Sequence, residues 1–372
     1  MKGRPIWQPQ FLTALNPEET IPAAHPLRGI KKFCDEALRR LSPLFEELYS
    51  DYGRASIPPE QLLKARVLMA LYSARSERRF CDQLQWNLLW MWFLDREVEE
   101  GSWNHSVFAK NSERVLSREV AALFFRAVYD QSREADWASD DHFSADGTLI
   151  EAWASMKSFV RKDGADAEKV DKSKDDDPGN PTIDFKGGAR RNDTHRSTTD
   201  PEAVLYRKGR GKEARLVYGF HALMENRNGL LAEFDVHNPI EVSEAAMALR
   251  QLQARAEDSG HTPQTVGADK GYHTKDFVQQ CRDMGVRPLV AQIEKRRVKG
   301  LDGRTTRTLG YKISQRIRKE IEERFGWSKV VGGLRRTMYR GEDKVAAWGS
   351  FIGTACNLVL MSRLAHAPPG SA

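Results

Sequence analysis

Cysteine and long apolar runs are both scarce in this chain. Its 372 residues include four cysteines, and no two of them form a Cys-x-x-Cys pair. This spacing indicates neither a zinc site nor a disulfide framework, and it favours a reducing cytoplasm. The longest apolar stretch, residues 345–361, is interrupted by Ser350, Thr354 and Asn357. It predicts a buried helix rather than a membrane span.

We expect no signal sequence either, because the first residues are basic and polar with prolines and have no apolar core. We therefore expect a cytoplasmic protein with no membrane segment. A chain of 372 residues exceeds the usual size of one compact core. Its length predicts two domains, or one domain with a large insertion.

Basic residues are in excess over acidic ones. The formal net charge is +6, and Lys and Arg crowd residues 295–340 with few acids among them. This cluster predicts either a surface for a long polyanion or a solvated helix face.

The first 135 residues have a helical pattern. Pro58-Pro59 starts one apolar-periodic segment, and Ser76 is a suitable N-cap for a second. The pair is compatible with a DNA-reading helix-turn-helix or with the core of a plain helical bundle. Apolar neighbours favour a packing role for the aromatic residues at 86–93 over base stacking.

From residue 140 the pattern changes to strands separated by helices. The expected order is a strand at 142–146, a hairpin of 216–224 and 230–236, a helix from Ser243 to about 256, a strand at 265–268, a helix from Thr274, a strand at 287–291, and a long helix at 314–329. This order predicts an α/β (α+β) fold, a ribonuclease-H-like mixed sheet flanked by helices.

A very polar segment at about 154–206 interrupts this pattern. Its centre, residues 175–181, is rich in Asp, Pro and Gly, so it cannot bury much apolar area. We expect a partly disordered insertion loop. Its later half is basic and includes Arg190 and Arg191, which predicts either a DNA-contacting arm or a simple linker.

Two aspartates stand beside glycines at predicted strand ends. Gly147 follows Asp146, and Gly267 and Gly271 frame Asp269. Glycine allows a tight turn and a close ligand approach. We expect both carboxylates at the sheet edge facing one cavity, although an aspartate beside glycine can also simply cap a turn.

Glu322 is the third candidate acid. On one continuous helix it would share a face with Arg318 and Lys329. The opposite stripe should pack on the sheet; it consists of Ile313, Ile317, Ile321 and Phe325. A surface charge ladder is the alternative, and the neighbouring Glu323 is the rival for the same role.

These motifs resemble the DDE transposases of the insertion-sequence-five family of bacterial insertion sequences. The matching segments are residues 145–153, residues 267–272 and the Arg318, Glu322, Lys329 spacing; residues 56–63 through 104–108 resemble the helical domain that precedes such cores. The resemblance covers nearly the whole chain. One position departs from it: relatives often carry Tyr three residues before the helix Arg, where this chain has Gln315.

The resemblance implies a Mg²⁺-dependent transposase. A helical domain at 1–135 would bind DNA ends or dimerise, and 136–372 would be the catalytic domain. The enzyme would bind terminal inverted repeats, cleave DNA and transfer the strand into a target. Asp146, Asp269 and Glu322 would hold two Mg²⁺ ions, with Mn²⁺ as a substitute and Asp146 bridging both ions.

The implied partners are transposon-end and target DNA, bound by a homodimer in the bacterial cytoplasm at the nucleoid. The candidate DNA contacts are Arg318, Lys329, Lys270, Arg190, Arg191, Arg335 and Arg336. Two alternatives stay open: a catalytically silent repressor that binds element ends, and a related nuclease without strand transfer.

Overall fold

The N-terminal part of the chain is helical, as predicted. The computed structural model describes residues 16–48, 56–163, 184–185, 188–207, 209, 213–260, 262–293, 297–301 and 303–366. Its first elements are α1 (Pro17–Thr20), α2 (Pro26–Arg40), α3 (Ser42–Leu48), α4 (Pro59–Leu71), α5 (Glu77–Leu84), α6 (Leu88–Phe93), η1 (Val98–Glu100), α7 (His105–Val115) and α8 (Arg118–Glu134). Ser76 caps α5 by accepting a hydrogen bond from the backbone N–H of Arg79 at 3.3 Å.

Helix α4 is a core helix, because its side chains are buried nearly all round. Trp90 and Phe93 are buried too, which confirms their predicted packing role. Trp86 is the exception, with 85% of its surface exposed.

Six strands form one mixed sheet in the part of the chain that the structure describes. They are β1 (His142–Glu151), β6 (Val204–Tyr206), β7 (Arg215–Glu225), β8 (Leu231–His237), β9 (Thr265–Ala268) and β10 (Arg287–Val290). The order β10-β9-β1-β7 continues to β8, with β9 and β10 parallel to β1 and the hairpin β7–β8 antiparallel. This order confirms the predicted ribonuclease-H-like fold.

Strand β1 is longer than predicted. It was expected to end at Asp146, but it continues through Gly147 to Glu151 and pairs with β7 along that length. Asp146 therefore lies in the middle of a central strand and not at a strand end. Beyond Ser144, β1 has no partner from β9.

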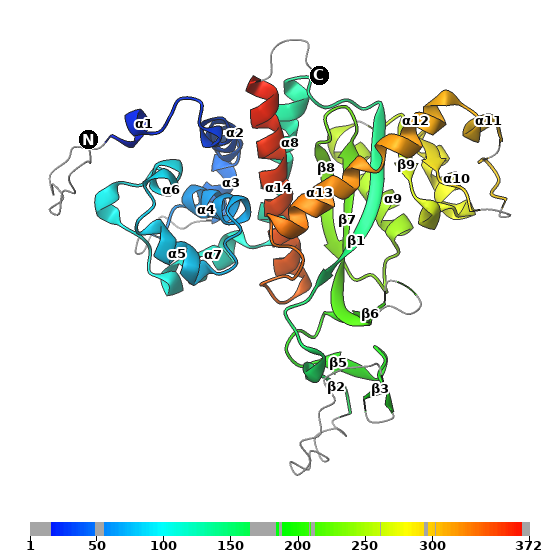
Figure 1. Ribbon diagram of the computed structural model, residues 1–372, viewed down its shortest axis with the longest axis horizontal. Coiled ribbons are helices and arrows are strands. Elements are labelled where there is room, and N and C mark those ends of the chain that lie inside the picture. Colours follow the sequence, from blue (N-terminus) through cyan, green and yellow to red (C-terminus); the bar gives the residue numbers. More distant parts are fainter. Residues whose placement is uncertain are drawn as a thin grey trace, which may run out of the picture.

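Helices cover both faces of this sheet (Figure 1). The helical elements that follow the β7–β8 hairpin are α9 (Glu244–Ser259), η3 (Lys270–Tyr272), α10 (Lys275–Asp283), α11 (Gly303–Thr306), α12 (Leu309–Ile317), α13 (Glu320–Val330) and α14 (Glu342–His366), and of these α9, α10, α12, α13 and α14 contact strands of the sheet. Both sides of the sheet are thereby shielded, and β7 is buried along all of its length except Arg215.

The prediction of one long helix at 314–329 is wrong, because this segment forms parts of two helices, α12 and α13. At the junction the backbone N–H groups of Ile321 and Glu322 bond to the carbonyls of Arg318 and Lys319, three residues back. Such a 3₁₀ turn has three residues per turn instead of 3.6, so it changes the helix register. Ile313, expected to pack on the sheet, is 38% exposed, whereas Ile321 and Phe325 are buried.

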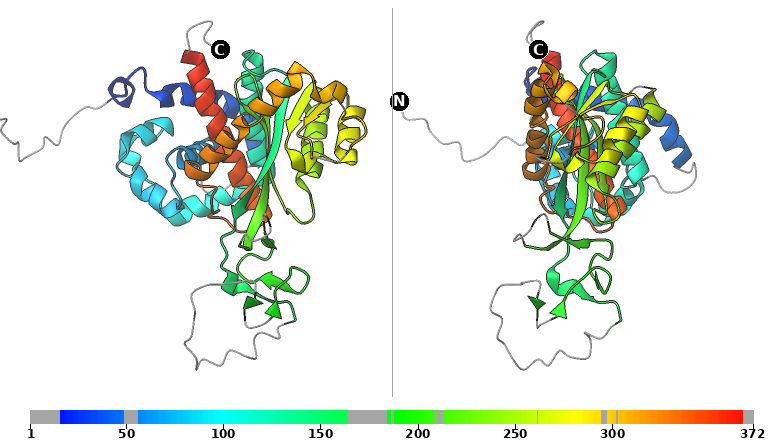
Figure 2. Two further views of the ribbon diagram at one scale, coloured as in Figure 1. Left: turned by 45° about the vertical axis from the view of Figure 1, so that its right-hand side comes forward. Right: turned by 90° about the vertical axis from the view of Figure 1, so that its right-hand side faces the viewer.

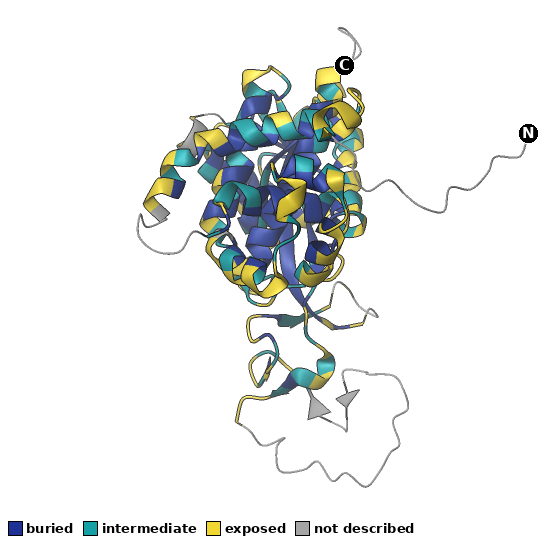
Figure 3. Cartoon of the chain, turned by 90° about the vertical axis from the view of Figure 1, so that its left-hand side faces the viewer, coloured by how far each residue is buried: buried dark blue, intermediate teal, exposed yellow. Residues whose placement is uncertain are grey.

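Helix α14 is the buried helix predicted at 345–361. It is long and apolar enough to cross a membrane, but 94% of its apolar window is buried inside the protein. It packs on α2, α4 and α8 on one side and on β8 and α13 on the other. Figure 3 shows the buried residues gathered in the interior of the molecule and the exposed ones on its outside.

The polar insertion is only partly irregular. It contains η2 (Met156–Ser158) and the short strands β2 (Phe159–Arg161), β3 (Asp184–Phe185), β4 (Gly188–Ala189) and β5 (His195–Ser197). β2 pairs with β5, and this unit extends away from the main sheet (Figure 2). Residues 164–183, the centre of the predicted loop, lie outside the described residues.

Arg66 connects the helical region to the segment before α14. Its side chain is fully buried and bonds to Glu77 at 2.7 Å and to the Tyr339 hydroxyl at 2.5 Å. The guanidinium also lies 5.0 Å from the centre of the Phe108 ring. A buried charge is stable only with such partners, so this network holds α4, α5 and residue 339 in one arrangement.

We expect Arg66→Ala to lower the free energy of unfolding by about 3–5 kcal/mol, because it leaves the partly buried Glu77 carboxylate without its cation. Urea unfolding would measure this change. Arg78→Ala, on the exposed side of α5, should change the free energy by less than about 0.5 kcal/mol. Equal unfolding midpoints for the two variants would contradict the role of Arg66.

Candidate active site

Asp146 and Asp269 lie at the same level on neighbouring strands. Ser144 on β1 pairs with Gly267 on β9, and the two strands are parallel. Each aspartate lies two residues further along, and the backbone of Asp269 is still extended. A step of two keeps both side chains on one face of the sheet, on strands about 4.8 Å apart.

This face is the one that α12 and α13 cross. A Cβ atom built on Gly267 would lie 2.6 Å from Ser314 Oγ and 3.5 Å from Arg318 Cβ. Lower on β1, Lys329 of α13 donates a hydrogen bond to Thr148 Oγ1 at 2.5 Å. Asp146 lies between these two contact points along the sheet, so it faces the same helices.

Gly147, on the opposite face, admits the side chain of Glu244 behind Asp146. A Cβ atom at Gly147 would lie 2.9 Å from Cγ and Cδ of Glu244, the first residue of α9. Gly147 therefore allows Glu244 to approach the middle of β1 closely. The predicted tight turn at Gly147 is wrong, because the strand continues through it. Nothing in the local sequence marks Glu244 as a neighbour of Asp146.

Asp269 caps the short helix η3. Its half-buried carboxylate accepts a hydrogen bond from the backbone N–H of Gly271 at 2.6 Å. One of the two carboxylate oxygens of Asp269 therefore caps a turn, as the alternative interpretation of the sequence predicts. The carboxylate of Asp146 likewise accepts from the backbone N–H of Gly147 at 2.8 Å.

A buried polar network lies behind the Asp269 turn. The Tyr272 hydroxyl is 2.7 Å from His221 Nε2, and His221 Nδ1 is 2.7 Å from Gln251 Oε1. Because Gln251 Oε1 only accepts, His221 Nδ1 donates to it and Nε2 accepts from Tyr272. The network joins β7, α9 and η3, and it was not found from the sequence.

Burial determines the protonation of this network. It lowers the pKa of His221 to about 3, which keeps the imidazole neutral. Burial, followed by the charges of Glu244, Asp146 and Asp269, raises the pKa of Tyr272 well above its usual value. Tyr272 therefore keeps its proton and holds the turn that carries Asp269.

Gln315, the departure from the family pattern, holds Arg318. Its amide nitrogen donates to the carbonyl of Leu289 at 2.6 Å, and its Oε1 accepts from Arg318 Nε at 2.9 Å. The side chain thus connects the end of β10 with the guanidinium at the α12–α13 junction. Arg318 is half-buried and directed by this contact.

Glu322 and Lys329 lie on the same flank of α13. At 3.6 residues per turn, residues seven apart differ by roughly 20° around the helix, whereas Glu323 lies roughly 120° from Lys329. Lys329 contacts β1, so the Glu322 flank is turned toward that strand. Both glutamates are exposed.

The three acids supply only oxygen donors, which suit hard divalent cations such as Mg²⁺. Two of them share one patch of the sheet, and the third extends from a helix that crosses the same face. Among the described residues, however, no three acidic, His or Cys side chains are close enough together to hold a metal ion. The predicted convergence of all three is thus incomplete in this arrangement of α13.

The predicted DNA-contacting residues differ in how exposed they are and in what they contact. Lys270, Arg191, Arg335 and Arg336 are exposed. Arg336 also lies 4.9 Å from the centre of the Trp153 ring. Arg190 instead donates to the carbonyls of Met156 and Phe159 at 3.0 and 3.1 Å, within the insertion.

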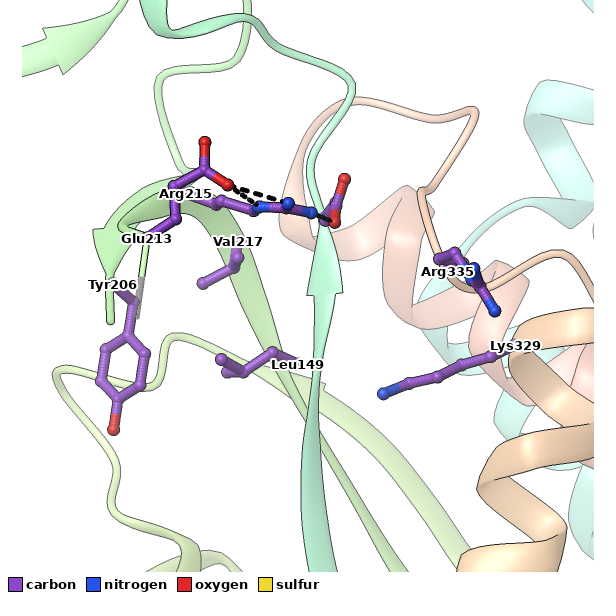
Figure 4. Close-up of a pocket in the computed structure, with 8 residues that line it drawn as sticks. Leu149, Tyr206, Glu213, Arg215, Val217, Lys329 and Arg335 are labelled. Atoms are coloured by element: carbon purple, nitrogen blue, oxygen red, sulfur yellow. Dashed lines mark hydrogen bonds and ion pairs between the residues drawn. The ribbon is translucent and has the colours of Figure 1, made fainter. Parts of the chain in front are cut away.

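A pocket of about 380 Å³ opens at the C-terminal end of β1 (Figure 4). It is lined by Leu149, Glu151, Tyr206, Glu213, Arg215, Val217, Lys329 and Arg335. We refer to it as the β1-edge pocket. Only Lys329 and Arg335 of this set were singled out by the sequence.

Two protein-family descriptions match the sequence. A transposase domain (DUF772) matches residues 15–114, and a transposase DDE domain matches residues 192–358. Asp269 and Glu322 lie inside the second match, and Asp146 lies outside both. No curated protein sequence matches the chain.

Three solved structures are similar to the chain. The piggyBac transposase synaptic complex with hairpin DNA has a TM-score of 0.40 at 8% identity and covers 91% of this chain and 75% of that chain. The Mos1 paired-end complex with left transposon end has 0.20 at 13%, covering 86% and 100%. The Mos1 strand transfer complex has 0.21 at 11%, covering 91% and 96%.

The buried imidazole predicts a loss of stability in acid. An unfolded histidine takes up a proton near its ordinary pKa of 6.5, whereas the folded pKa of His221 is about 3. Stability from this group is therefore present above pH 6.5 and lost as the pH falls; at pH 5 the loss is about 2 kcal/mol. Urea unfolding at pH 7 and pH 5 would measure it.

In His221→Gln the difference between the two pH values should shrink by about that amount. The exposed His105 provides the matched control, since His105→Gln should keep the pH dependence of the wild type. An unchanged difference in His221→Gln would contradict the neutral buried state.

Proposed function

We propose that this chain, which is a DDE transposase, cuts and joins DNA at a site formed by Asp146, Asp269 and Glu322. One observation supports the assignment of these residues. Asp146 and Asp269 lie side by side on one face of the sheet, and α13 crosses that face. Carboxylates on rigid neighbouring strands keep a constant separation, as a catalytic site requires.

We assign the third role to Glu322 rather than Glu323. Ile321 and Phe325 bury one stripe of α13. Glu322 lies beside that stripe on the flank of Lys329, whereas Glu323 points away from the sheet. A small shift of α13 along its packing face would bring Glu322 toward the two aspartates.

The cofactor we propose is a pair of Mg²⁺ ions, for which Mn²⁺ could substitute, held by the three carboxylates. When bound, the ions supply Lewis acidity at the attacking and leaving oxygens of a phosphodiester. Three neighbouring carboxylates repel one another, so the cations would also favour their joint ionisation. Asp146, on the central strand β1, would contact both ions.

The protein's own cations would place the DNA. Arg318, directed by Gln315, and Lys329, bonded to Thr148, lie above and below the Asp146 level on one face. A phosphate backbone that passes over both would present one phosphodiester to the acids. The exposed Arg335 and Arg336 would continue this path past the end of β1.

The remaining assignments follow from the resemblance to the insertion-sequence-five family. Helices in 1–135 would bind the terminal inverted repeats or dimerise, and 136–372 would catalyse cleavage and strand transfer. A homodimer would bring two element ends together. The Arg66 network supports this division of labour, because it would hold the two regions in a constant relation on DNA.

Conservative amide substitutions test the acids. Asp146→Asn, Asp269→Asn and Glu322→Gln should each lower DNA cleavage and joining by at least about a thousandfold, because each removes a metal ligand worth several kcal/mol. Products from linear DNA with the terminal repeats, run with Mg²⁺, provide the measurement. Mn²⁺ titration followed by electron paramagnetic resonance provides a readout that does not depend on activity.

Glu323→Gln is the matched control and should keep wild-type rates. Full activity in Glu322→Gln with loss in Glu323→Gln would transfer the role to Glu323. Cleavage without joined products in the wild type would indicate a nuclease, and DNA binding without either would indicate a repressor.

The basic path predicts salt-sensitive binding. DNA affinity should fall with salt concentration along a log–log slope of roughly −0.9 for each phosphate contact. The double variant Arg335→Ala, Arg336→Ala should reduce the magnitude of that slope by about 2. Fluorescence anisotropy at several salt concentrations would measure both slopes, and identical slopes would remove this segment from the DNA path.

A further inference from the structure

One edge of β1 is open beside Asp146. β9 pairs with β1 only as far as Ser144, and the next backbone contact on that edge joins Glu151 to residues 335–337. Between these two contacts, no strand that the structure describes pairs with this edge of β1. Side chains from the two faces of the sheet can therefore meet around the open edge.

The Asp146 carboxylate lies at this open edge. The backbone N–H of Glu151 bonds to Arg335, on the side of β1 away from β7. Backbone groups alternate between the two edges along a strand, so Gly147, four residues earlier, directs its N–H to the same side. The Asp146 carboxylate accepts a hydrogen bond from that N–H at 2.8 Å, which places it at the edge.

Glu244 reaches the same level of β1 from the opposite face of the sheet. It is the first residue of α9, which packs on β1 and β7. A Cβ atom at Gly147 would lie 2.9 Å from Cγ, Cδ and Oε1 of Glu244, so the carboxylate rests on the strand directly behind Asp146. Glu244 is also exposed, so a hydrated ion at the open edge has access to it.

The buried hydroxyl of Tyr272 lies near three carboxylates. It is on the α9 side of the sheet, 2.7 Å from His221 Nε2. Burial raises the pKa of this hydroxyl most, followed by the charges of Glu244, Asp146 and Asp269. The charge of Glu244 therefore acts at the same place as the charges of the two aspartates.

We propose that Glu244 is a fourth acid of the cation site, and that it helps to hold a divalent cation at Asp146 and Asp269 through the hydration water of that cation. The proposal rests on the metal-dependent DNA cleavage proposed above. It makes Glu244 a positioning residue, because its carboxylate acts on the cation through water.

The spacing of the acids favours contact through water. Among the described residues, no three acidic, His or Cys side chains are close enough together to hold one ion directly. Mg²⁺ keeps several waters when one or two carboxylates bind it, so a further carboxylate nearby can bind those waters. Groups in this outer position orient the direct ligands, and losing one lowers metal affinity about 10- to 100-fold.

A structural role for Glu244 is the alternative. A carboxylate in the first turn of a helix is stabilised by the helix dipole and by the N–H groups that have no partner within the helix. Removing its charge would then lower folding stability and leave cation affinity unchanged. Cation affinity and folding stability therefore separate the two roles.

Mn²⁺ titration of the full-length protein without DNA, followed by electron paramagnetic resonance, tests the proposal. Glu244→Gln should weaken Mn²⁺ binding about 10- to 100-fold. Glu257→Gln is the matched control and should bind Mn²⁺ as the wild type does, because Glu257 is exposed near the other end of the same helix, about 20 Å away. Equal Mn²⁺ affinity in Glu244→Gln and the wild type would overturn the proposal.

The Mg²⁺ dependence of DNA cleavage provides a second arm. In Glu244→Gln the Mg²⁺ concentration for half-maximal cleavage should rise by about the same factor, and saturating Mg²⁺ should return the rate close to that of the wild type. Glu322→Gln lacks a proposed direct ligand, so it should stay slow at saturating Mg²⁺. A defect in Glu244→Gln that Mg²⁺ does not reduce would also overturn the positioning role.

Gly147→Ala tests the position of the carboxylate while leaving its charge in the chain. The added Cβ would displace Glu244 from the strand, because it would lie 2.9 Å from Glu244 Cγ and Cδ. Mn²⁺ binding should weaken in Gly147→Ala, and Glu244→Gln should then cost much less affinity than it does alone. Fully additive losses would show that the two positions act independently and would contradict the proposal.

Urea unfolding midpoints of all these variants would separate a folding defect from a binding defect. A lower midpoint for Glu244→Gln with wild-type Mn²⁺ affinity would indicate the structural role and overturn the proposal. If Glu244→Gln weakens Mn²⁺ binding but the wild type cleaves no DNA, the proposed chemistry fails and the assignment of Glu244 stands. Cleavage by the wild type with equal Mn²⁺ affinity in both proteins gives the opposite result.

Discussion

The enclosure of α14 is the constraint on which the rest of the structure depends. A helix that is apolar all round has no face for solvent and must be covered on every side. The N-terminal helices cover one side and β8 covers the other. The Asn357 amide bonds to both the N–H and the carbonyl of Leu231, at 2.9 and 2.8 Å, so a side chain closes part of this sheet edge. Two distant parts of the sequence therefore share one core.

This core also determines the orientation of α13. The helix precedes α14 and packs against the same side of the sheet, with Phe325 in an edge contact on Phe220 at 5.5 Å. Arg324 bonds to the carbonyl of Gly229 on one flank, and Lys329 bonds to Thr148 on the other. With three contacts on three sides, the helix has little freedom to roll. The flank that carries Glu322 is therefore determined by packing.

The three candidate acids differ in how they are supported. Asp146 and Asp269 extend from strands whose spacing is set by backbone hydrogen bonds, and the Tyr272–His221 pair supports the Asp269 turn from behind. Glu322 has only the helix surface to hold it. A site built in this way keeps two ligands constant and leaves the third to respond to cation and DNA. Lys329 bonds to Thr148 on the face of Asp146 and also lines the β1-edge pocket, to which Leu149 contributes from the opposite face.

Much of the fold could be predicted because its signals are local. The Asn-rich turn at 226–229, the caps Ser76 and Thr274 and the apolar period of the helices all act within a few residues. The length of β1 could not, because Gly147 is explained by Glu244, which lies far along the chain. The α12–α13 break has no glycine or proline to mark it. It occurs where Gln315 and Arg318 are tied to β10.

The sequence by itself determined the types of residue that the site uses and the strands and helices that carry them. Spacing, turn chemistry and acidic residues are properties of short segments, so they can be read without coordinates. Only the tertiary structure decided that Asp146 lies in mid-strand, that α12 and α13 are separate helices, and that Tyr206, Lys329 and Arg335 line one pocket. These relations depend on strand register and helix packing, which bring together residues that no local signal connects.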